Sequence, residues 1–205
     1  CTIGPRRFTG LLTDFNSRHK GIQLQLVEGV PRQLSQLLES GEIDVAIMAS
    51  SEEFPERFDA TPLYRERFML AFPPGHRLAR MEMVPFREID GEIYLRRVNC
   101  EYRDYLSETC RELGVVLNIS YTSEREDWIQ NMVAGGLGIC FLPEYSAVVP
   151  GLQVRPVSEP DVVREVCLVT VSGRRFSPAV STFVNAVKSY GWAEGARADS
   201  RLSAA

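Results

Sequence analysis

Cys100 is the residue of this sequence best suited to chemistry, because a cysteine thiolate is a strong nucleophile and is readily oxidised. Asn99 has the side chain of a helix N-cap, which predicts that Cys100 lies in the first turn of a helix. The positive end of a helix dipole favours a thiolate, an effect that Glu101 opposes. Three cationic side chains are near in the sequence: Arg96, Arg97 and Arg103.

A second cysteine, Cys110, follows on the apolar stripe of the same expected helix. At a rise of 1.5 Å per residue the two would be about 15 Å apart, whereas a disulfide requires Cα atoms within about 7 Å. The pair can therefore join only if the helix partly unwinds. A redox switch is thus the alternative to a simpler interpretation, in which Cys100 is a polar cysteine of a cleft and Cys110 is a core residue.

The remaining cysteines point away from a disulfide framework. The chain has five cysteines, an odd number, and no CxxC pair. Cys140 and Cys167 lie within the apolar runs GICFLP and VCLVTV, where cysteine behaves as a small hydrophobic residue. We therefore expect a reducing, cytoplasmic location.

The sequence lacks the patterns that usually mark enzymes. His19 lies near a helix C-terminus, His76 follows a turn, and neither is spaced to share a metal with a cysteine. HExxH, GxSxG and P-loop motifs are absent. The segment 136–138, GLG, has Phe141 where a dinucleotide fingerprint requires glycine, so it predicts a tight turn. We expect no catalytic residues, no cofactor and no metal.

Helix N-termini are better candidates, because their free backbone amides attract small anions and carboxylates. Every α/β protein has such helix starts, so they form a specific site only if two lobes bring them together. The sequence offers four of them: Thr2 to Pro5, Gly29 to Pro31, Asn99 to Glu101, and Ser123 to Glu124.

Helices and strands alternate in the first part of the chain. Apolar residues recur at helical spacing from Arg6 until Gly21, and again in the helix that Pro31 opens and Gly41 ends. Between them Ile22, Leu24 and Leu26 alternate with glutamine, which predicts a half-buried strand. Val45 to Met48 reads as a short buried strand.

The alternation continues in the second part. We expect strands at 68–72, 93–95, 115–119, 139–142 and 162–171, and helices over 102–113, behind Ser123, and from Ser177. Ser123 and Glu126 match a capping box. Breaks at Pro73-Pro74-Gly75 and at Gly173-Arg174-Arg175 separate two α/β lobes.

Composition limits where nucleic acid could bind. The 205 residues are 44% hydrophobic and carry a net charge of −4, which opposes a broad contact with a phosphate backbone. No run approaches the roughly 18 apolar residues of a membrane span. The sequence begins at Cys1, so a lipid-anchored solute-binding protein is one alternative; DNA binding, if any, belongs to a segment before Cys1.

Several segments together resemble the effector-binding domain of LysR-type transcriptional regulators. In chain order they are CTIGPRRFTGLLTDFNSRHKGIQLQLVEG, LLESGEIDVAIM, TPLYRERFMLAFPPGHRLA and MVAGGLGICFLPE. The resemblance implies an α/β fold of two Rossmann-like lobes, like type 2 periplasmic binding proteins, joined by two crossover strands. Lobe I would comprise 1–72 and 173–192, lobe II 73–172, and a flexible tail 193–205. A winged helix-turn-helix would precede this chain.

The resemblance also implies a small-molecule effector bound between the lobes of a homodimer or homotetramer. Many carboxylate-binding members have threonine at the position of Val30, so the resemblance does not imply a carboxylate effector for this chain. The stretch NCEYRDYLSETC is similar to the peroxide-sensing OxyR branch, which makes a thiol sensor using Cys100 and Cys110 the alternative function. The expected effector-binding residues are Thr2, Ile3, Gly4, Gly29, Val30, Met48, Asn99, Cys100 and Glu124.

Overall fold

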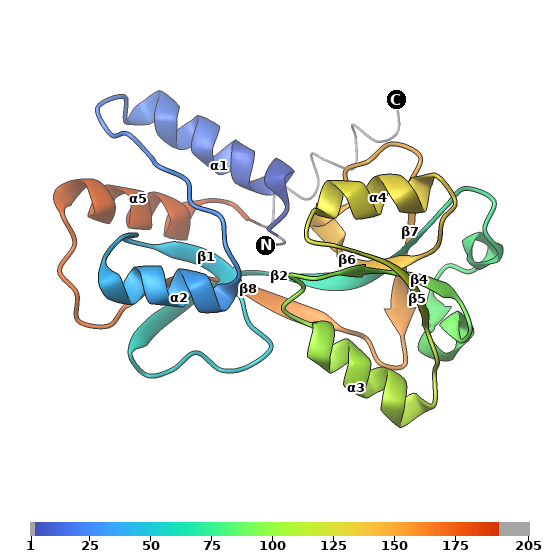
Figure 1. The fold of residues 1–205 in the computed structure, drawn as a ribbon. Helices are drawn as coiled ribbons and strands as arrows, with labels where there is room; N and C mark the ends of the chain where they lie inside the picture. The colour runs from blue at the N-terminus through green and yellow to red at the C-terminus, as the bar shows by residue number, and fades with distance from the viewer. Residues whose placement is uncertain (1–2, 193–205) are drawn as a thin grey trace. The chain divides into compact units, whose positions relative to one another are not determined.

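A computed structural model describes residues 3–192 and divides them into two compact units (Figure 1). Unit 1 comprises residues 3–65 and 165–192, and unit 2 comprises residues 66–164. The chain passes between the units twice, within strand β2 (Phe58–Phe72) and within strand β8 (Val163–Val171). Thr2 and the predicted tail 193–205 lie outside the described residues. Within 3–192 no helix is both long and apolar enough to cross a bilayer.

Unit 1 packs helices against a short antiparallel pair of strands. Strand β1 (Ala46–Ala49) pairs with β8, Met48 opposite Cys167. Leu34 and Leu38 cover this pair, and Phe15 meets Phe183 edge to face with ring centroids 5.1 Å apart. Besides parts of β2 and β8, the elements of unit 1 are α1 (Pro5–Arg18), α2 (Pro31–Ser40), β1 (Ala46–Ala49) and α5 (Pro178–Ser189).

The helix boundaries of unit 1 follow the local signals in the sequence. Pro31 occupies the first turn of α2, and Gly41 ends this helix in the left-handed conformation, φ 80°. At the start of α5 the Ser177 hydroxyl accepts a hydrogen bond from the Val180 amide at 3.3 Å. These predicted helices are confirmed.

The predicted strand at Ile22–Leu26 is wrong for the described structure. Residues 22–30 form no helix or strand, and the side chains of Leu24 and Leu26 are exposed. Alternation determines which side chains share a face, but a strand also requires a neighbour for its backbone hydrogen bonds. No strand within 3–192 pairs with this segment.

Unit 2 contains a mixed group of strands, mostly antiparallel, and a separate parallel pair. The second half of β2 pairs with β6 (Cys140–Pro143) and β7 (Gln153–Ser158), and β4 (Ile93–Arg97) runs parallel to β5 (Asn118–Ser123). The elements are short 3₁₀ helices η1 (Arg77–Arg80), η2 (Phe86–Ile89) and η3 (Glu144–Ser146), strands β3 (Val84–Pro85), β4 (Ile93–Arg97), β5 (Asn118–Ser123), β6 (Cys140–Pro143) and β7 (Gln153–Ser158), and helices α3 (Arg103–Leu113) and α4 (Glu126–Ala134).

Helices α3 and α4 cover opposite faces of the β4–β5 pair (Figure 1). On one side Leu95 packs with Ile129 and Val133 of α4. On the other side Leu106 of α3 belongs to a larger core that includes Phe141. Because side chains alternate along a strand, residues 94 and 96 face α3 while 95 and 97 face α4.

The helix expected over 102–113 is confirmed, but three other predictions in unit 2 are wrong. Asn99 is not the N-cap: α3 begins at Arg103 with Tyr102 as N-cap, so Cys100 lies in the turn before the helix. Helix α4 begins at Glu126, and the Ser123 hydroxyl accepts from the Arg125 amide instead of forming a capping box. Strand β5 covers Asn118–Ser123 rather than 115–119. The turn at Gly136-Leu137-Gly138 and the buried strand at 139–142 are confirmed.

Candidate functional site

Cys100 lies in the turn between β4 and α3 and is half-buried. Its carbonyl accepts a hydrogen bond from the Arg103 amide, which closes the turn that precedes the helix. Its Sγ atom accepts a hydrogen bond from Arg97 Nη2 at 3.3 Å. The thiol is therefore held beside a guanidinium of β4 rather than within the first turn of α3.

Arg97 organises this end of unit 2. Its side chain is only 5% exposed, and a buried arginine requires a counter-ion and partners for its donors. Nη1 donates to Glu126 Oε2 at 2.9 Å, and Nε donates to the carbonyl oxygen of Phe141 at 3.0 Å. Burial raises the pKa of Glu126, although the charge and hydrogen bond of Arg97 act in the opposite direction. Glu126, the first residue of α4, is thus the counter-ion of Arg97.

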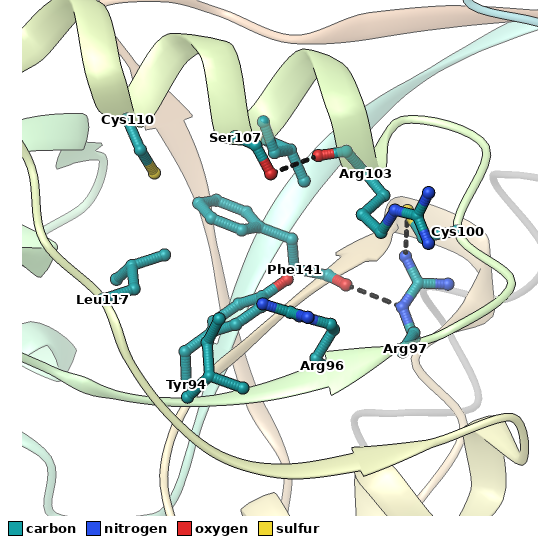
Figure 2. Close-up of a pocket in the computed structure, with 11 residues that line it drawn as sticks. Tyr94, Arg96, Arg97, Cys100, Arg103, Ser107, Cys110, Leu117 and Phe141 are labelled. Carbon is teal, nitrogen blue, oxygen red and sulfur yellow. Dashed lines mark hydrogen bonds between the residues drawn. The ribbon is translucent and has the colours of Figure 1, made fainter.

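A pocket of about 210 Å³ opens between β4, β5 and α3 (Figure 2). Arg97, Arg103 and Cys100 lie at one end of the view, and Cys110 and Leu117 lie at the other. Burial raises the pKa of the Cys110 thiol, which keeps it protonated. The lining residues are Tyr94, Arg96, Arg97, Cys100, Arg103, Leu106, Ser107, Cys110, Leu117, Ile119 and Phe141.

A buried ion cluster ties the Cys100 turn to the crossover strands. Arg164 of β8 has a fully buried side chain and donates from Nε to Glu66 Oε1 of β2 at 2.9 Å. It also donates from Nη1 to Glu101, the residue after Cys100. The second oxygen of Glu66 accepts from the Tyr145 amide at 3.3 Å. The turn that carries Cys100 is therefore held in place by Arg164, through Glu101.

The predicted effector residues of unit 1 lie at two helix starts and in one strand. Gly4 is the N-cap of α1, with Ile3 before it. Val30 is the N-cap of α2, and its amide donates to the Gln33 side chain at 3.2 Å. Met48 is buried in β1.

The predicted residues of unit 2 lie at one edge of the β4–β5 pair. Asn99 and Cys100 follow β4, and Glu124 follows β5. Because the strands are parallel, their carboxyl ends meet, as the 3.0 Å hydrogen bond from the Val98 amide to the Ser123 carbonyl shows. Unit 2 therefore brings its three predicted residues to one edge, which in α/β sheets is the edge where ligands bind.

Sequence reasoning missed the pocket itself and the role of Glu126. Arg96 and Arg97 were noted as charges near Cys100, but strand alternation places them on opposite faces of β4. Glu126 was assigned to a capping box, a pattern that uses only neighbouring residues. The ring of Phe141, from a strand far along the chain, completes the pocket.

Comparison with known proteins identifies the family. Residues 1–192 match the LysR substrate binding domain. A hydrogen peroxide-inducible genes activator of Haemophilus influenzae is 26% identical over 198 residues, covering 92% of this chain and 65% of the relative. The DNA-binding transcriptional dual regulator OxyR of Escherichia coli K12 is 30% identical over 175 residues, covering 82% of this chain and 56% of the relative.

The fold agrees with this match. The effector binding domain of QuiR in complex with shikimate superposes with a TM-score of 0.77 at 20% identity, covering 90% of each chain. That likeness concerns the fold of two α/β lobes, as predicted. The chain spans less than two thirds of the length of these two curated regulators. It belongs to the LysR substrate-binding domain family.

Proposed function

We propose that this chain is the effector-sensing domain of a LysR-type transcriptional regulator. In this proposal a small molecule binds between the two lobes, and a DNA-binding segment outside the chain receives the signal through the geometry of an oligomer. The observation that carries the proposal is the family match over 1–192, combined with two compact units between which the chain crosses twice. A ligand with different affinity for two arrangements of the lobes shifts their populations, and no covalent step is required.

The proposed effector site draws on both units. The starts of α1 and α2 contribute Ile3, Gly4, Gly29 and Val30, with Met48 from β1; the β4 and β5 edge of unit 2 contributes Asn99, Cys100 and Glu124. Thr2, which precedes the described residues, is proposed as a further member of the site. Backbone amides at helix starts favour an anionic or polar group on the effector. The chain is proposed to act by binding rather than by turnover, in the cytoplasm.

A thermal-shift experiment with shikimate, benzoate and 2-oxoglutarate as probes tests this site. We expect at least one probe to raise the melting temperature of the wild-type chain, because binding to the folded state alone stabilises it. Thr2→Val and Asn99→Ala should remove the shift, whereas Thr9→Val, on the exposed side of α1, should retain it. A probe that stabilises all four proteins equally would contradict the assigned residues.

Thiol-based peroxide sensing is the second candidate function. Cys100 and Cys110 line one pocket, and a guanidinium contacts the Cys100 sulfur. Hydrogen peroxide would oxidise the Cys100 thiol to a sulfenic acid, releasing water. Attack by the Cys110 thiol would then form a disulfide and release a second water. Burial raises the pKa of Cys110, which leaves less of its thiolate for that second step.

Peptide mapping after hydrogen peroxide treatment tests the redox candidate. Dimedone labelling should mark Cys100, and Cys100→Ser should abolish the label. Cys140→Ser is the matched control, because that thiol is buried in β6. Absence of both a sulfenate at Cys100 and a Cys100–Cys110 bond would eliminate this candidate while leaving effector sensing intact.

A further inference from the structure

Arg96 is a charged residue of β4 that lines the pocket. It lies on the face of β4 that meets α3, together with Tyr94, and its side chain is half-buried. Among residues 3–192 its guanidinium has no hydrogen bond or ion pair. Arg97, one residue later on the opposite face, has a partner for each of its three nitrogens. No nitrogen of Arg96 is among the buried unpartnered atoms of residues 3–192, so its N–H donors are open to solvent or to an anionic ligand.

The charged residues that line the pocket leave the positive charge of Arg96 unbalanced. The lining contains three arginines and no carboxylate. Glu126 neutralises Arg97, and Arg103 contacts the adjacent Asp104 at 3.0 Å, an exposed ion pair of little energetic weight. The pocket therefore offers a positive site with five N–H donors to a negatively charged group.

Other residues of the pocket lining are apolar. Leu117, Ile119 and Phe141 are among them, and Ile119 is largely exposed despite being a large hydrophobic residue. Covering such a surface is favourable by about 25 cal/mol per Å². The volume of about 210 Å³ is below the range of roughly 300–1,000 Å³ that is usual for drug-sized ligands. An occupant would be small and would combine an anionic head with an apolar body.

We propose that this pocket is a binding site for a small organic anion, a carboxylate or sulfonate with a single ring or a short hydrocarbon chain. Arg96 binds the head group, and Leu117, Ile119 and Phe141 contact the body. All lining residues belong to unit 2, and Cys100 is the one residue shared with the proposed effector site. The proposal does not rest on effector sensing, and the chain could bind in this pocket even if no effector bound between the lobes.

Isothermal titration of the full chain under reducing conditions tests the proposal, with 3-phenylpropionate, hexanoate and benzenesulfonate as probes. We expect one site per chain for at least one probe. Arg96→Gln should weaken that binding about tenfold or more, because a charge-assisted contact is lost. Ser107→Trp should abolish it, since this exposed residue at the rim of the pocket can be enlarged without disturbing the core.

Three controls make the result specific to the pocket. Arg111→Gln removes an exposed arginine of α3 outside the lining and should leave affinity unchanged, as should Thr9→Val on the exposed side of α1 in unit 1. For a binding acid, the alcohol of the same skeleton should bind more weakly. The proposal is overturned if no probe binds at millimolar concentration, if the alcohol binds equally well, or if folded Arg96→Gln or Ser107→Trp retains full affinity.

Discussion

Arg164 is the residue on which the interior of unit 2 depends most. Its side chain is 0% exposed and contacts two carboxylates from distant segments, Glu66 and Glu101. Replacing a whole buried ion cluster by apolar residues can be harmless, but removing one partner leaves buried charge uncompensated. Losing Arg164 should therefore cost more free energy of unfolding than losing any single contact of the cluster.

Arg164→Met should lower the free energy of unfolding by about 3–5 kcal/mol, because Glu66 and Glu101 would remain buried without their counter-ion. Urea denaturation measures this. The matched control is Arg65→Met, which removes an exposed arginine that pairs with Glu165 at 2.8 Å. That control should cost less than about 1 kcal/mol. Similar losses in the two variants would contradict the importance of the buried cluster.

The buried thiol of Cys140 makes the free energy of unfolding fall as the pH becomes alkaline. Burial raises the pKa of its thiol from 9.0 to about 12. Between these values the folded chain retains a proton that the unfolded chain has released, so stability falls as pH rises through this window. At pH 10.5 the loss from this thiol is about 2 kcal/mol. Cys140→Ala should remove that part of the pH dependence, measured as the change in unfolding free energy between pH 8 and 10.5. An unchanged pH slope would show that the thiol does not contribute.

At the scale of elements, the turn from α4 into β6 depends on a close backbone approach. Gly138 has φ 154°, and a Cβ atom there would lie 2.5 Å from the Ile93 carbonyl oxygen of β4. That carbonyl accepts a hydrogen bond from the Ile139 amide at 2.8 Å. A side chain at 138 would push β6 away from β4, and Phe141 of the pocket lies on β6.

Gly138→Ala should therefore destabilise the chain by more than about 2 kcal/mol, from backbone strain and steric overlap together. Gly21→Ala is the control, because a Cβ atom at Gly21 meets nothing within 4 Å. Thermal unfolding of the two variants measures the difference. If Gly138→Ala melted at the same temperature as Gly21→Ala, the close approach would not be a constraint.

Local sequence patterns predicted the helices well and the strands less well. The starts of α2 and α5 and the glycine that ends α2 are properties of neighbouring residues, and all were confirmed. Strand β7 was missed because its sequence, QVRPVS, has no clear alternation and its strand character comes from pairing with β2 and β3. Strand pairing joins residues far apart in the sequence, which a local pattern does not contain.

The sequence likewise predicted only part of the candidate site. Cys100 and its neighbouring arginines were identified from residue types alone. The orientation of the arginines was not, because it depends on the exact phase of β4. The helix expected at Cys100 begins three residues later. The carboxylate of Glu126, which was expected to cap a helix, instead accepts a hydrogen bond from Arg97. A buried charge outside the helix outweighed a local capping pattern worth about 1 kcal/mol.

At the scale of the whole molecule, we propose that copies of the chain associate as a homodimer or homotetramer. Within residues 3–192, strand β5 pairs with β4 alone, so its outer edge is unpaired. Ile119 and Tyr121 on this strand are exposed. An exposed apolar edge strand is a typical surface for pairing with a second copy.

Tyr121→Glu should shift the chain toward monomer in size-exclusion chromatography with light scattering, because a charge at the edge opposes its burial. Tyr105→Glu is the control: Tyr105 lies on α3 and its exposure, 42%, is close to the 47% of Tyr121. The control should elute as the wild type does. A wild-type monomer, or an oligomer that Tyr121→Glu leaves intact, would exclude this edge as the interface.

The ion cluster at Arg164 also constrains how relatives of this chain can diverge. Glu66, Glu101 and Arg164 come from three separate segments, and losing Arg164 alone leaves two carboxylates in the interior without this cation. Losing one carboxylate instead leaves Arg164 paired with the other. Among relatives we expect an uncharged residue at the position of Arg164 to occur only where both carboxylates are also replaced, and an alignment in which relatives keep both glutamates without the arginine would contradict this.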